Sequence, residues 1–332
     1  MRSLLLLFAA AAVSAADTAQ LHIFAMAKPG ESVEVAKIPA LAAAAYGRPH
    51  MTMPPTPVFR LSDIPFLGAD RKEKLDLYFP NGPKRLDRPA VVFIHGGGFT
   101  GGDKAEYRSA SVSADLCRAG YVVVSCNYVL GPKSKEGVWP QNIADCRNAV
   151  RWVRAHAKEL GVNPDKIAVA GGSAGGYLAL MVGLSDDKTG PGGDPAAKVS
   201  AKVSAVIDMY GVVNFSKHGK GIVPGAALAD QGAYLPESQC DALDPAVLIL
   251  HGTADTTVDI TQSDDMAKAL RSAKASYEYI VVDGAPHTFD LHPKGKGWKR
   301  TGIIAGAEVS SSSDKADLTE ATLDFLARTI GK

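Results

Sequence analysis

Short apolar runs alternate with helical patterns along most of this chain, from residue 58 onward. Runs such as Ala90–His95 and Lys166–Ala170 are continuous, which is typical of strands buried on both faces of a sheet. Helical patterns separate most of these runs, as the connection of parallel strands requires. The alternation therefore predicts a mostly parallel sheet of about eight strands with helices on both faces. The expected strands are 58–66, 74–79, 90–95, 121–128, 166–170, 203–210, 246–251 and 277–283, and the expected helices are 104–119, 142–160, 174–184, 262–272 and 314–330.

The first 16 residues have the pattern of an export signal rather than of a folded element. Arg2 is followed by the apolar run 4–13 and then by Ser14, Ala15 and Ala16. A positive start, a short apolar stretch and small residues, in this order, are the three parts of a secretory signal peptide. Cleavage near Ala15 or Ala16 predicts an exported protein, either secreted or periplasmic.

The rest of the chain divides into two segments. Residues 17–57 are rich in alanine and proline with weak periodicity, and we expect an irregular N-terminal arm there. Residues 58–332 carry the regular pattern and form the main domain. Within this domain, residues 212–241 interrupt the alternation with scattered glycine, proline and alanine, and they are the candidate for a short lid.

Charge and cysteine content exclude several classes of function. The chain has 36 basic and 35 acidic residues, a net charge of +1, which provides no electrostatic footprint for nucleic acid or an anionic membrane. No interior apolar run approaches the roughly 20 residues of a membrane-spanning helix. The four cysteines form no C-x-x-C pair or Cys/His cluster, which argues against a zinc site, although one disulfide between two of them remains open. The cysteines are Cys117, Cys126, Cys146 and Cys240.

A serine stands in a glycine-rich turn between an expected strand and an expected helix. The G-x-S-x-G sequence at 171–175 is centred on Ser173 and leads into the helix 174–184. A serine on such a turn is held with its hydroxyl above the sheet, and the glycines let neighbouring backbone come close. This indicates a nucleophile at Ser173. A glycine-rich loop at a sheet edge and a phosphate-binding turn are the alternatives, although no nucleotide P-loop motif is present.

A second glycine cluster, HGGGF at 95–99, follows another buried apolar run. Three consecutive glycines expose backbone N–H groups without obstruction by side chains, and such donors stabilise the oxyanion of acyl transfer. We expect the N–H groups of Gly97, Gly98 and Ala174 to form an oxyanion hole. His95 is expected to fix this loop by hydrogen bonding.

A serine nucleophile needs a base, and the base needs a carboxylate that orients it. Of the eight histidines, His287 and His292 follow the last expected strand, and His287 lies closer to its end. Asp255 follows the strand 246–251, with Asp259 as the alternative acid. The order Ser173, Asp255, His287 matches the Ser…Asp…His order of α/β-hydrolases, and we expect these three residues to form a catalytic triad.

On these stretches the chain resembles the α/β-hydrolase superfamily, specifically esterases with an HGGG oxyanion loop, and it is similar to hormone-sensitive-lipase-like carboxylesterases. The nearer resemblance is to secreted bacterial esterases of the acetyl xylan/feruloyl esterase kind. It covers about residues 65–330 and rests on HGGGF at 95–99, GGSAGG at 171–176, HGTAD at 251–255 and GAPHTF at 284–289.

The resemblance implies an α/β-hydrolase fold with a catalytic domain at 58–332. It also implies a secreted carboxylic ester hydrolase that acts on short-chain esters, including acetyl or feruloyl esters of plant polysaccharide. No metal or organic cofactor is implied, and the expected partner is a small-molecule or polysaccharide ester. The oligomeric state is open.

The chain departs from the family in two places. Where the family often reads N-Y-R-L, this chain has Val129 in place of the arginine. The N-terminal helical cap of the lipase-like branch has no counterpart. Two other functions remain open, a serine peptidase on the same fold and a non-catalytic binding protein that keeps the fold.

Overall fold

The computed structural model describes residues 23–26, 37–38, 40–41, 58–68, 70–81, 83, 85–131, 139–194, 196–218 and 231–332. The expected signal peptide lies outside the described residues, as does most of the arm at 17–57. Within that arm, residues 23–25 form one short strand, β1.

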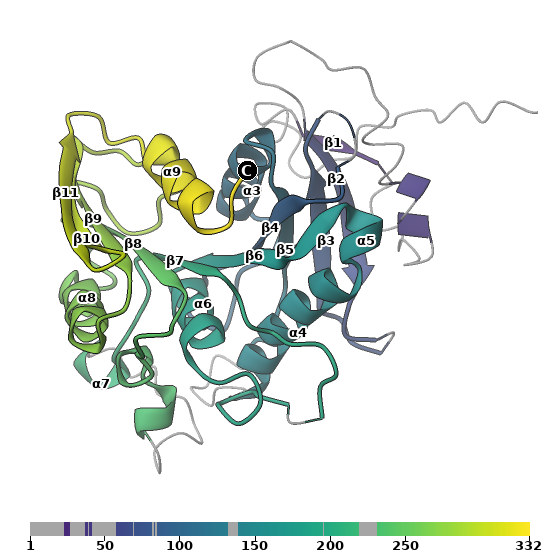
Figure 1. Cartoon of the computed structure of the whole chain (residues 1–332), viewed down its shortest axis with the longest axis horizontal. Helices are drawn as coiled ribbons and strands as arrows, with labels where there is room; N and C mark the ends of the chain where they lie inside the picture. The colour runs from purple at the N-terminus through teal and green to yellow at the C-terminus, as the bar shows by residue number, and fades with distance from the viewer. Residues whose placement is uncertain are drawn as a thin grey trace, which may run out of the picture.

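A single 11-stranded sheet crosses the molecule (Figure 1). Its order is β1-β2-β3-β5-β4-β6-β7-β8-β9-β10-β11. The strands are β1 (Ile23–Ala25), β2 (Val58–Pro65), β3 (Lys74–Phe79), β4 (Arg88–Ile94), β5 (Val122–Cys126), β6 (Val162–Gly172), β7 (Ala205–Met209), β8 (Ala246–Gly252), β9 (Tyr277–Asp283), β10 (Gly297–Ile304) and β11 (Ala307–Ser313).

The prediction of a mostly parallel sheet is confirmed, but the expected number of strands was too low. Each expected strand is present with ends shifted by a few residues, and β1, β10 and β11 are additional. β10 and β11 form an antiparallel hairpin on the edge of β9. β11 has only exposed and partly covered residues, and the two buried residues of β10 are glycines, so neither strand carries the continuous apolar run that marks a buried strand.

The central strands run parallel, in the order β5-β4-β6-β7-β8-β9. Their carboxyl ends therefore meet at one edge of the sheet, where ligands of open α/β sheets usually bind. The nucleophile turn follows β6, the HGGG loop follows β4, and the loops with Asp255 and His287 follow β8 and β9. The topology thus brings all the expected site residues to one edge.

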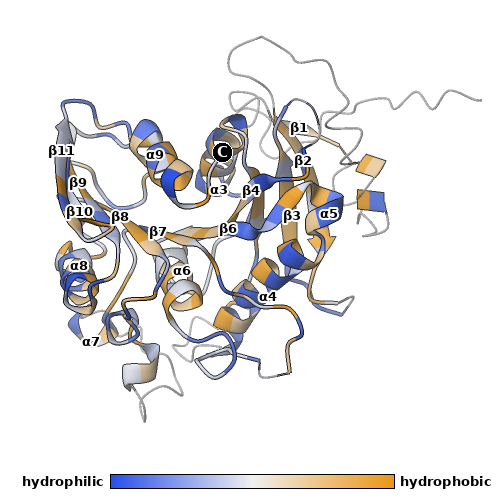
Figure 2. Ribbon diagram, viewed as in Figure 1, coloured by the Kyte–Doolittle hydropathy of each residue, from blue (hydrophilic) through white to orange (hydrophobic). Residues whose placement is uncertain are grey.

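Helices cover both faces of the sheet (Figure 1). On one face, α3 (Tyr107–Arg118) and α9 (Thr319–Thr329) contribute to one apolar core. On the other face, α4 (Gln141–Ala155), α6 (Ala174–Leu184) and α8 (Thr261–Ala273) contribute to a second and larger core. β4 shows how one strand serves both faces, because Val91 and Phe93 pack into the first core and Val92 and Ile94 into the second. The central strands are accordingly mostly apolar, apart from the polar start of β6 (Figure 2).

Two regions differ from the expectation in detail. The expected helix 142–160 is interrupted at His156, after which α5 (Ala157–Leu160) continues. His156 has a φ of −104° and a ψ of 18°, outside the helical region, although its N–H and its Nδ1 both contact the carbonyl oxygen of Trp152, at 3.1 and 2.8 Å. In the candidate lid, the described residues form α7 (Phe215–His218) and the 3₁₀ turns η3 (Gln231–Tyr234) and η4 (Pro236–Ser238).

All four cysteines are free thiols, and three of them are buried, with Cys240 only partly buried. No helix among the described residues combines the length and the apolar character needed to cross a membrane.

Candidate active site

Ser173 occupies a strained turn between β6 and α6. Its φ of 56° and ψ of −119° lie outside the helical and extended regions that non-glycine residues prefer. Its N–H donates to the carbonyl oxygen of Met209 on β7 at 2.8 Å, which ties the turn to the sheet. The flanking glycines permit this turn, since a Cβ on Gly171 would lie 2.2 Å from the carbonyl oxygen of Gly175. Strain of this kind persists only where the surrounding structure enforces it, and it is frequent at active sites.

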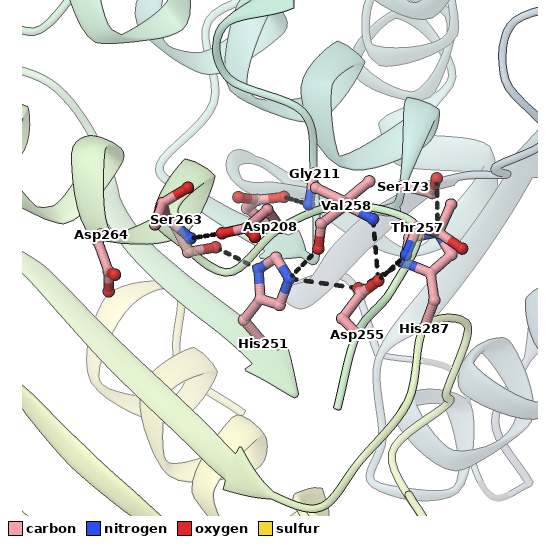
Figure 3. A network of polar contacts seen from close by, with 12 residues as sticks. Ser173, Asp208, Gly211, His251, Asp255, Thr257, Val258, Ser263, Asp264 and His287 are labelled. Atoms are coloured by element: carbon pink, nitrogen blue, oxygen red, sulfur yellow. Dashed lines mark hydrogen bonds and ion pairs between the residues drawn. The ribbon is translucent and has the colours of Figure 1, made fainter. Parts of the chain in front are cut away.

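His287 lies on the loop after β9 and reaches the nucleophile turn. Its Nε2 lies 3.0 Å from Oγ of Ser173, and its Nδ1 lies 2.6 Å from Oδ2 of Asp255 (Figure 3). The ring of Tyr210 packs edge-on against the imidazole, with ring centres 4.9 Å apart. The Tyr210 hydroxyl donates to the carbonyl oxygen of Phe289 on the same loop. Tyr210 therefore packs against His287 and is hydrogen-bonded to its loop. The sequence motifs did not indicate Tyr210.

Asp255 is held by several donors in the turn after β8. Its side chain is fully buried, and Oδ1 accepts the N–H groups of Thr257 and Val258 at 2.8 and 2.9 Å. Burial alone acts to raise the pKa of Asp255, but hydrogen bonds from His251, His287 and Val258 outweigh it and hold the pKa well below its usual range. An ionised carboxylate only accepts hydrogen bonds. Nδ1 of His287 therefore carries the hydrogen that Asp255 receives, which leaves Nε2 free to accept the hydroxyl of Ser173.

The two alternative residues take other partners. His292 lies between two carboxylates, with Nε2 2.9 Å from Asp115 and Nδ1 2.6 Å from Asp317. Asp259 accepts the N–H of Thr261 at the start of α8. The structure therefore brings Ser173 together with His287 and Asp255 rather than with either alternative.

The HGGG loop lies directly against the nucleophile. A Cβ on Gly96 would lie 3.3 Å from Cβ of Ser173. Gly97 and Gly98 both have positive φ, at 113° and 60°, and both are at least partly exposed. Ala174, the third expected donor, begins α6 beside Ser173, where helical N–H groups lack partners within the helix. Gly97 and Gly98 follow Gly96 in this loop, and Ala174 follows Ser173 in the chain, so the oxyanion hole stays a prediction.

His95 lies inside this loop rather than in the triad. Its Nδ1 donates to the carbonyl oxygen of Gly96 at 2.7 Å, and its ring stacks on Tyr128 with centres 4.5 Å apart. Burial lowers the pKa of His95 to about 4, so the ring is neutral at neutral pH. This arrangement suits the expected role of fixing the loop.

Two different surroundings border the site. Beyond the HGGG loop, aromatic rings pack edge to face with centres 4.9 to 6.1 Å apart. This aromatic cluster consists of Phe99, Trp139, Tyr177, Phe215 and Tyr234. Beside the histidine loop, a pocket of about 460 Å³ opens between the start of α3 and the residues that flank His287. Its lining includes Glu106, Tyr107, Arg108, Pro286, Thr288 and Lys294.

Within the described ranges, no three His, Cys, Asp or Glu side chains lie close enough together to hold a metal ion.

Comparison with known proteins identifies the family. The BD-FAE family profile matches residues 75–270. The chain is 30% identical to the probable carboxylic ester hydrolase LipM of Mycobacterium tuberculosis, over 61% of this chain and 50% of LipM, so it spans about half of that relative. A thermophilic esterase of the planctomycete Thermogutta terrifontis, solved with butyrate bound, is 32% identical over 68% of this chain and 83% of its own, with a TM-score of 0.57.

A carbohydrate esterase from gut microbiota has a similar fold, with a TM-score of 0.64 over 82% of this chain and 96% of its own. At a sequence identity of 22%, this similarity is evidence for the fold alone. Together with the sheet order, these similarities identify the fold as that of the α/β-hydrolases. The chain belongs to the BD-FAE family.

Proposed function

We propose that this protein is a secreted serine esterase that hydrolyses short-chain carboxylic esters through Ser173, His287 and Asp255. The hydrogen bonds that run from Oγ of Ser173 through His287 to Asp255 carry this proposal. The names of the relatives support the same class of reaction, since LipM is named a carboxylic ester hydrolase and the Thermogutta protein an esterase.

The geometry supports a two-step acyl transfer. Oγ of Ser173 attacks the ester carbonyl carbon while Nε2 of His287 takes its proton, and Asp255 stabilises the imidazolium that forms. The N–H groups of Gly97, Gly98 and Ala174 stabilise the tetrahedral oxyanion. His287 then returns the proton to the leaving alkoxide as the C–O bond breaks. Water, activated by His287, attacks the acyl-enzyme and releases the acid.

The aromatic cluster supports a short acyl group. Phe99 follows Gly98 directly, and Tyr177 lies one helical turn after Ala174, so the backbone of both residues is close to the proposed oxyanion hole. Phe99 and Tyr177 are 4% and 0% exposed, and their T-shaped contact leaves little room between them. A well-packed cluster cannot admit a long chain without rearrangement. These observations favour an acetyl group over the larger feruloyl group, and the butyrate bound to the Thermogutta esterase is also short.

The pocket beside the histidine loop supports a large and polar alcohol. His287 protonates the leaving alkoxide, so the alcohol leaves on the histidine side, where Pro286 and Thr288 line the pocket. The ring of Tyr107 is 51% exposed at this pocket, and Glu106, Arg108 and Lys294 add charged groups. An exposed aromatic ring among hydrogen-bonding groups suits a carbohydrate, which has both apolar and hydroxyl faces. We therefore propose acetylated plant polysaccharide as the substrate class.

Hydrolysis of p-nitrophenyl esters of increasing acyl length tests the esterase proposal. We expect high kcat/KM for the acetate, a modest decrease for the butyrate and a loss for the octanoate. Cleavage of the ester but not of the matching p-nitroanilide separates an esterase from a peptidase. Labelling by a fluorophosphonate separates both enzymes from a binding protein. An octanoate that is the best substrate would contradict the short acyl group.

Tyr107→Ala tests the alcohol side. We expect kcat/KM for an acetylated xylo-oligosaccharide to decrease by about 3- to 10-fold, the value of one aromatic contact, with p-nitrophenyl acetate unaffected. Leu86→Ala is the matched control, because Leu86 is also exposed, at 68%, and does not line the pocket. Equal effects of the two substitutions on the oligosaccharide would contradict the proposed subsite.

The secretion proposal rests on the N-terminal sequence pattern. Expression of the full chain in a bacterial host, followed by mass spectrometry of the exported fraction, tests it directly. We expect a mature N-terminus near Ala16 or Asp17. Retention of the full-length chain in the cytosol would contradict the proposal.

A further inference from the structure

His251 contacts the acid of the proposed triad from behind. It lies near the end of β8, is fully buried, and places Nε2 3.2 Å from Oδ2 of Asp255 (Figure 3). The same Nε2 lies 3.0 Å from the carbonyl oxygen of Val258. On the other side of the ring, Nδ1 lies 2.6 Å from Oγ of Ser263 on α8. His251 therefore joins a strand, the Asp255 turn and a helix.

These partners determine which nitrogen of His251 carries hydrogen. The carbonyl oxygen of Val258 and the carboxylate of Asp255 can only accept, so Nε2 must be protonated. The Ser263 hydroxyl can donate to Nδ1, which completes a neutral ring with both nitrogens satisfied. Nε2–H of His251 thus donates to the carbonyl oxygen of Val258, with Oδ2 of Asp255 3.2 Å from the same nitrogen, and Ser263 holds the ring in the required tautomer.

One oxygen of Asp255 is shared by two histidines. Oδ2 receives Nδ1–H of His287 at 2.6 Å and faces Nε2–H of His251 at 3.2 Å. The other oxygen receives two backbone N–H groups of its own turn. Among these donors, His251 is the one that comes from the rigid sheet. A ring held in the sheet is suited to set the direction in which Oδ2 faces His287.

A second carboxyl group also faces His251. Asp208, on the neighbouring strand β7, is fully buried, and Oδ1 accepts the N–H of Gly211 at 2.9 Å. Its Oδ2 has no hydrogen-bond partner among the described residues. Burial raises the pKa of Asp208, to about 7. The ring thus lies in a buried polar network rather than in an apolar core (Figure 3).

We propose that His251 is a positioning residue of the triad, which acts through Asp255 to hold His287 in line with Ser173. This inference rests on the proposed function, because it assumes that the triad performs the chemistry. It adds a fourth side chain, held by Ser263, to the three that the sequence motifs indicate. The energetic reason is that a carboxylate with a fixed direction needs no reorganisation when the imidazolium forms.

Paired substitutions test this role by separating the hydrogen bond from the volume of the ring. His251→Leu removes the donor, whereas His251→Gln keeps an N–H group near the position of Nε2. We expect the Leu variant to lose about 10- to 100-fold in kcat on p-nitrophenyl acetate, as for residues that orient a catalytic ligand, with KM unchanged. The Gln variant should recover most of this loss. His156→Gln, which removes a histidine distant from the triad, is the control.

A double-mutant cycle with Asp255→Ala distinguishes action through Asp255 from a general structural effect. If His251 acts through Asp255, His251→Leu lowers kcat in the wild-type background and has little further effect in the Asp255→Ala background. If the fold-losses in kcat of the two single variants multiply in the double variant, the proposal is overturned. Ser263→Ala leaves the ring in place and releases its tautomer, so it should lower kcat by a smaller factor in the same direction.

The possible outcomes separate this inference from the function itself. Equal kcat for His251→Leu and wild type, or equal losses in the Leu and Gln variants, would overturn the positioning role while leaving the esterase intact. If the Leu variant fails to fold, Ser263→Ala and His251→Gln decide instead, and an unchanged kcat in Ser263→Ala then overturns the proposal. An inactive wild type, or an active Ser173→Ala, would contradict the proposed function first.

Discussion

The centre of the sheet and its β10–β11 edge differ in burial and in the interactions that stabilise them. In the centre, every residue of β4, β5 and β7 is buried, and both faces are covered by helices. At the edge, β11 has no buried residue, and its hairpin with β10 is made of lysine, arginine, threonine and serine with few apolar groups. The centre is stabilised by packing on two faces, and the edge mainly by strand pairing, with Trp298 and Ile303 of β10 packed against the cores.

This difference explains where the site lies. A catalytic group must be held within a fraction of an ångström, and close packing on both faces provides that rigidity. Ser173, Asp255 and His287 all follow central parallel strands, and the hydrogen-bonded network behind them is buried between these strands and α8. We therefore expect substitutions to matter for activity at the centre and to matter little at the edge.

The largest effect is expected at the centre of the network. Asp255→Asn keeps the shape of the side chain but removes the charge that orients His287. Loss of the corresponding charge in a known triad lowers kcat by about 10⁴-fold, and we expect a similar decrease in kcat for p-nitrophenyl acetate. A variant that keeps wild-type kcat would place the acid elsewhere, with Asp259 as the first residue to test.

A second central effect concerns stability and pH. The folded pKa of Asp208 is raised by burial to about 7 from a usual value of 3.8, so folding favours its protonated form. Its contribution to stability is present below pH 4 and is lost as the pH rises toward 7. In Asp208→Asn this loss is absent. The melting temperature of the variant relative to that of the wild type should therefore increase as the pH rises from 4 to 7. Parallel pH profiles of the two melting temperatures would contradict the assignment.

A smaller effect is expected where the histidine loop reaches the surface. Hydrogen bonding to Asp115 and Asp317 raises the pKa of His292 to about 9. The stabilisation is therefore present below the ordinary pKa of 6.5 and is lost as the pH rises through 9. His292→Gln should lower the melting temperature at pH 7 but not at pH 10. The free energy of unfolding at pH 7 should decrease by less than about 1 kcal/mol, because the ring is half exposed. An equal decrease at both pH values would rule out this ion pair as the cause.

The smallest effect is expected at the sheet edge. Glu308 on β11 is paired with Arg271 across exposed surface, with side-chain exposures of 76% and 49%. Glu308→Gln should change the free energy of unfolding by less than about 0.5 kcal/mol and leave kcat unchanged. A loss of activity in this variant would break the contrast between centre and edge, and would show that the hairpin supports the site.

The same contrast explains what the sequence could predict about the fold. The central strands were predictable because burial on both faces demands continuous apolar runs, as in Ala90–His95. β10 and β11 were not predictable from the sequence. They form by pairing with β9 and with each other, and residues 297–313 show no hydrophobic period. The break at His156 is a change in the backbone angles of one residue, which no periodicity records.

The site residues that belong to sequence motifs were predictable. The glycine-rich turn indicated Ser173, and chain order indicated Asp255 and His287, which the structure brings into hydrogen-bonding distance. Their catalytic roles, and those of Gly97, Gly98 and Ala174, stay predictions. His251 and Tyr210 were not singled out, because a histidine or tyrosine at the end of a strand looks like any core residue until its partners from other elements are known.

The most direct test of the esterase account is the hydrolysis of p-nitrophenyl acetate by the wild type and by Ser173→Ala. We predict turnover by the wild type and a loss of at least about 10⁴-fold in kcat in the variant, with the same unfolding transition. A folded Ser173→Ala variant that retains more than about a tenth of the wild-type activity would contradict the account, because removal of the nucleophile from a known triad lowers kcat by about 10⁶-fold.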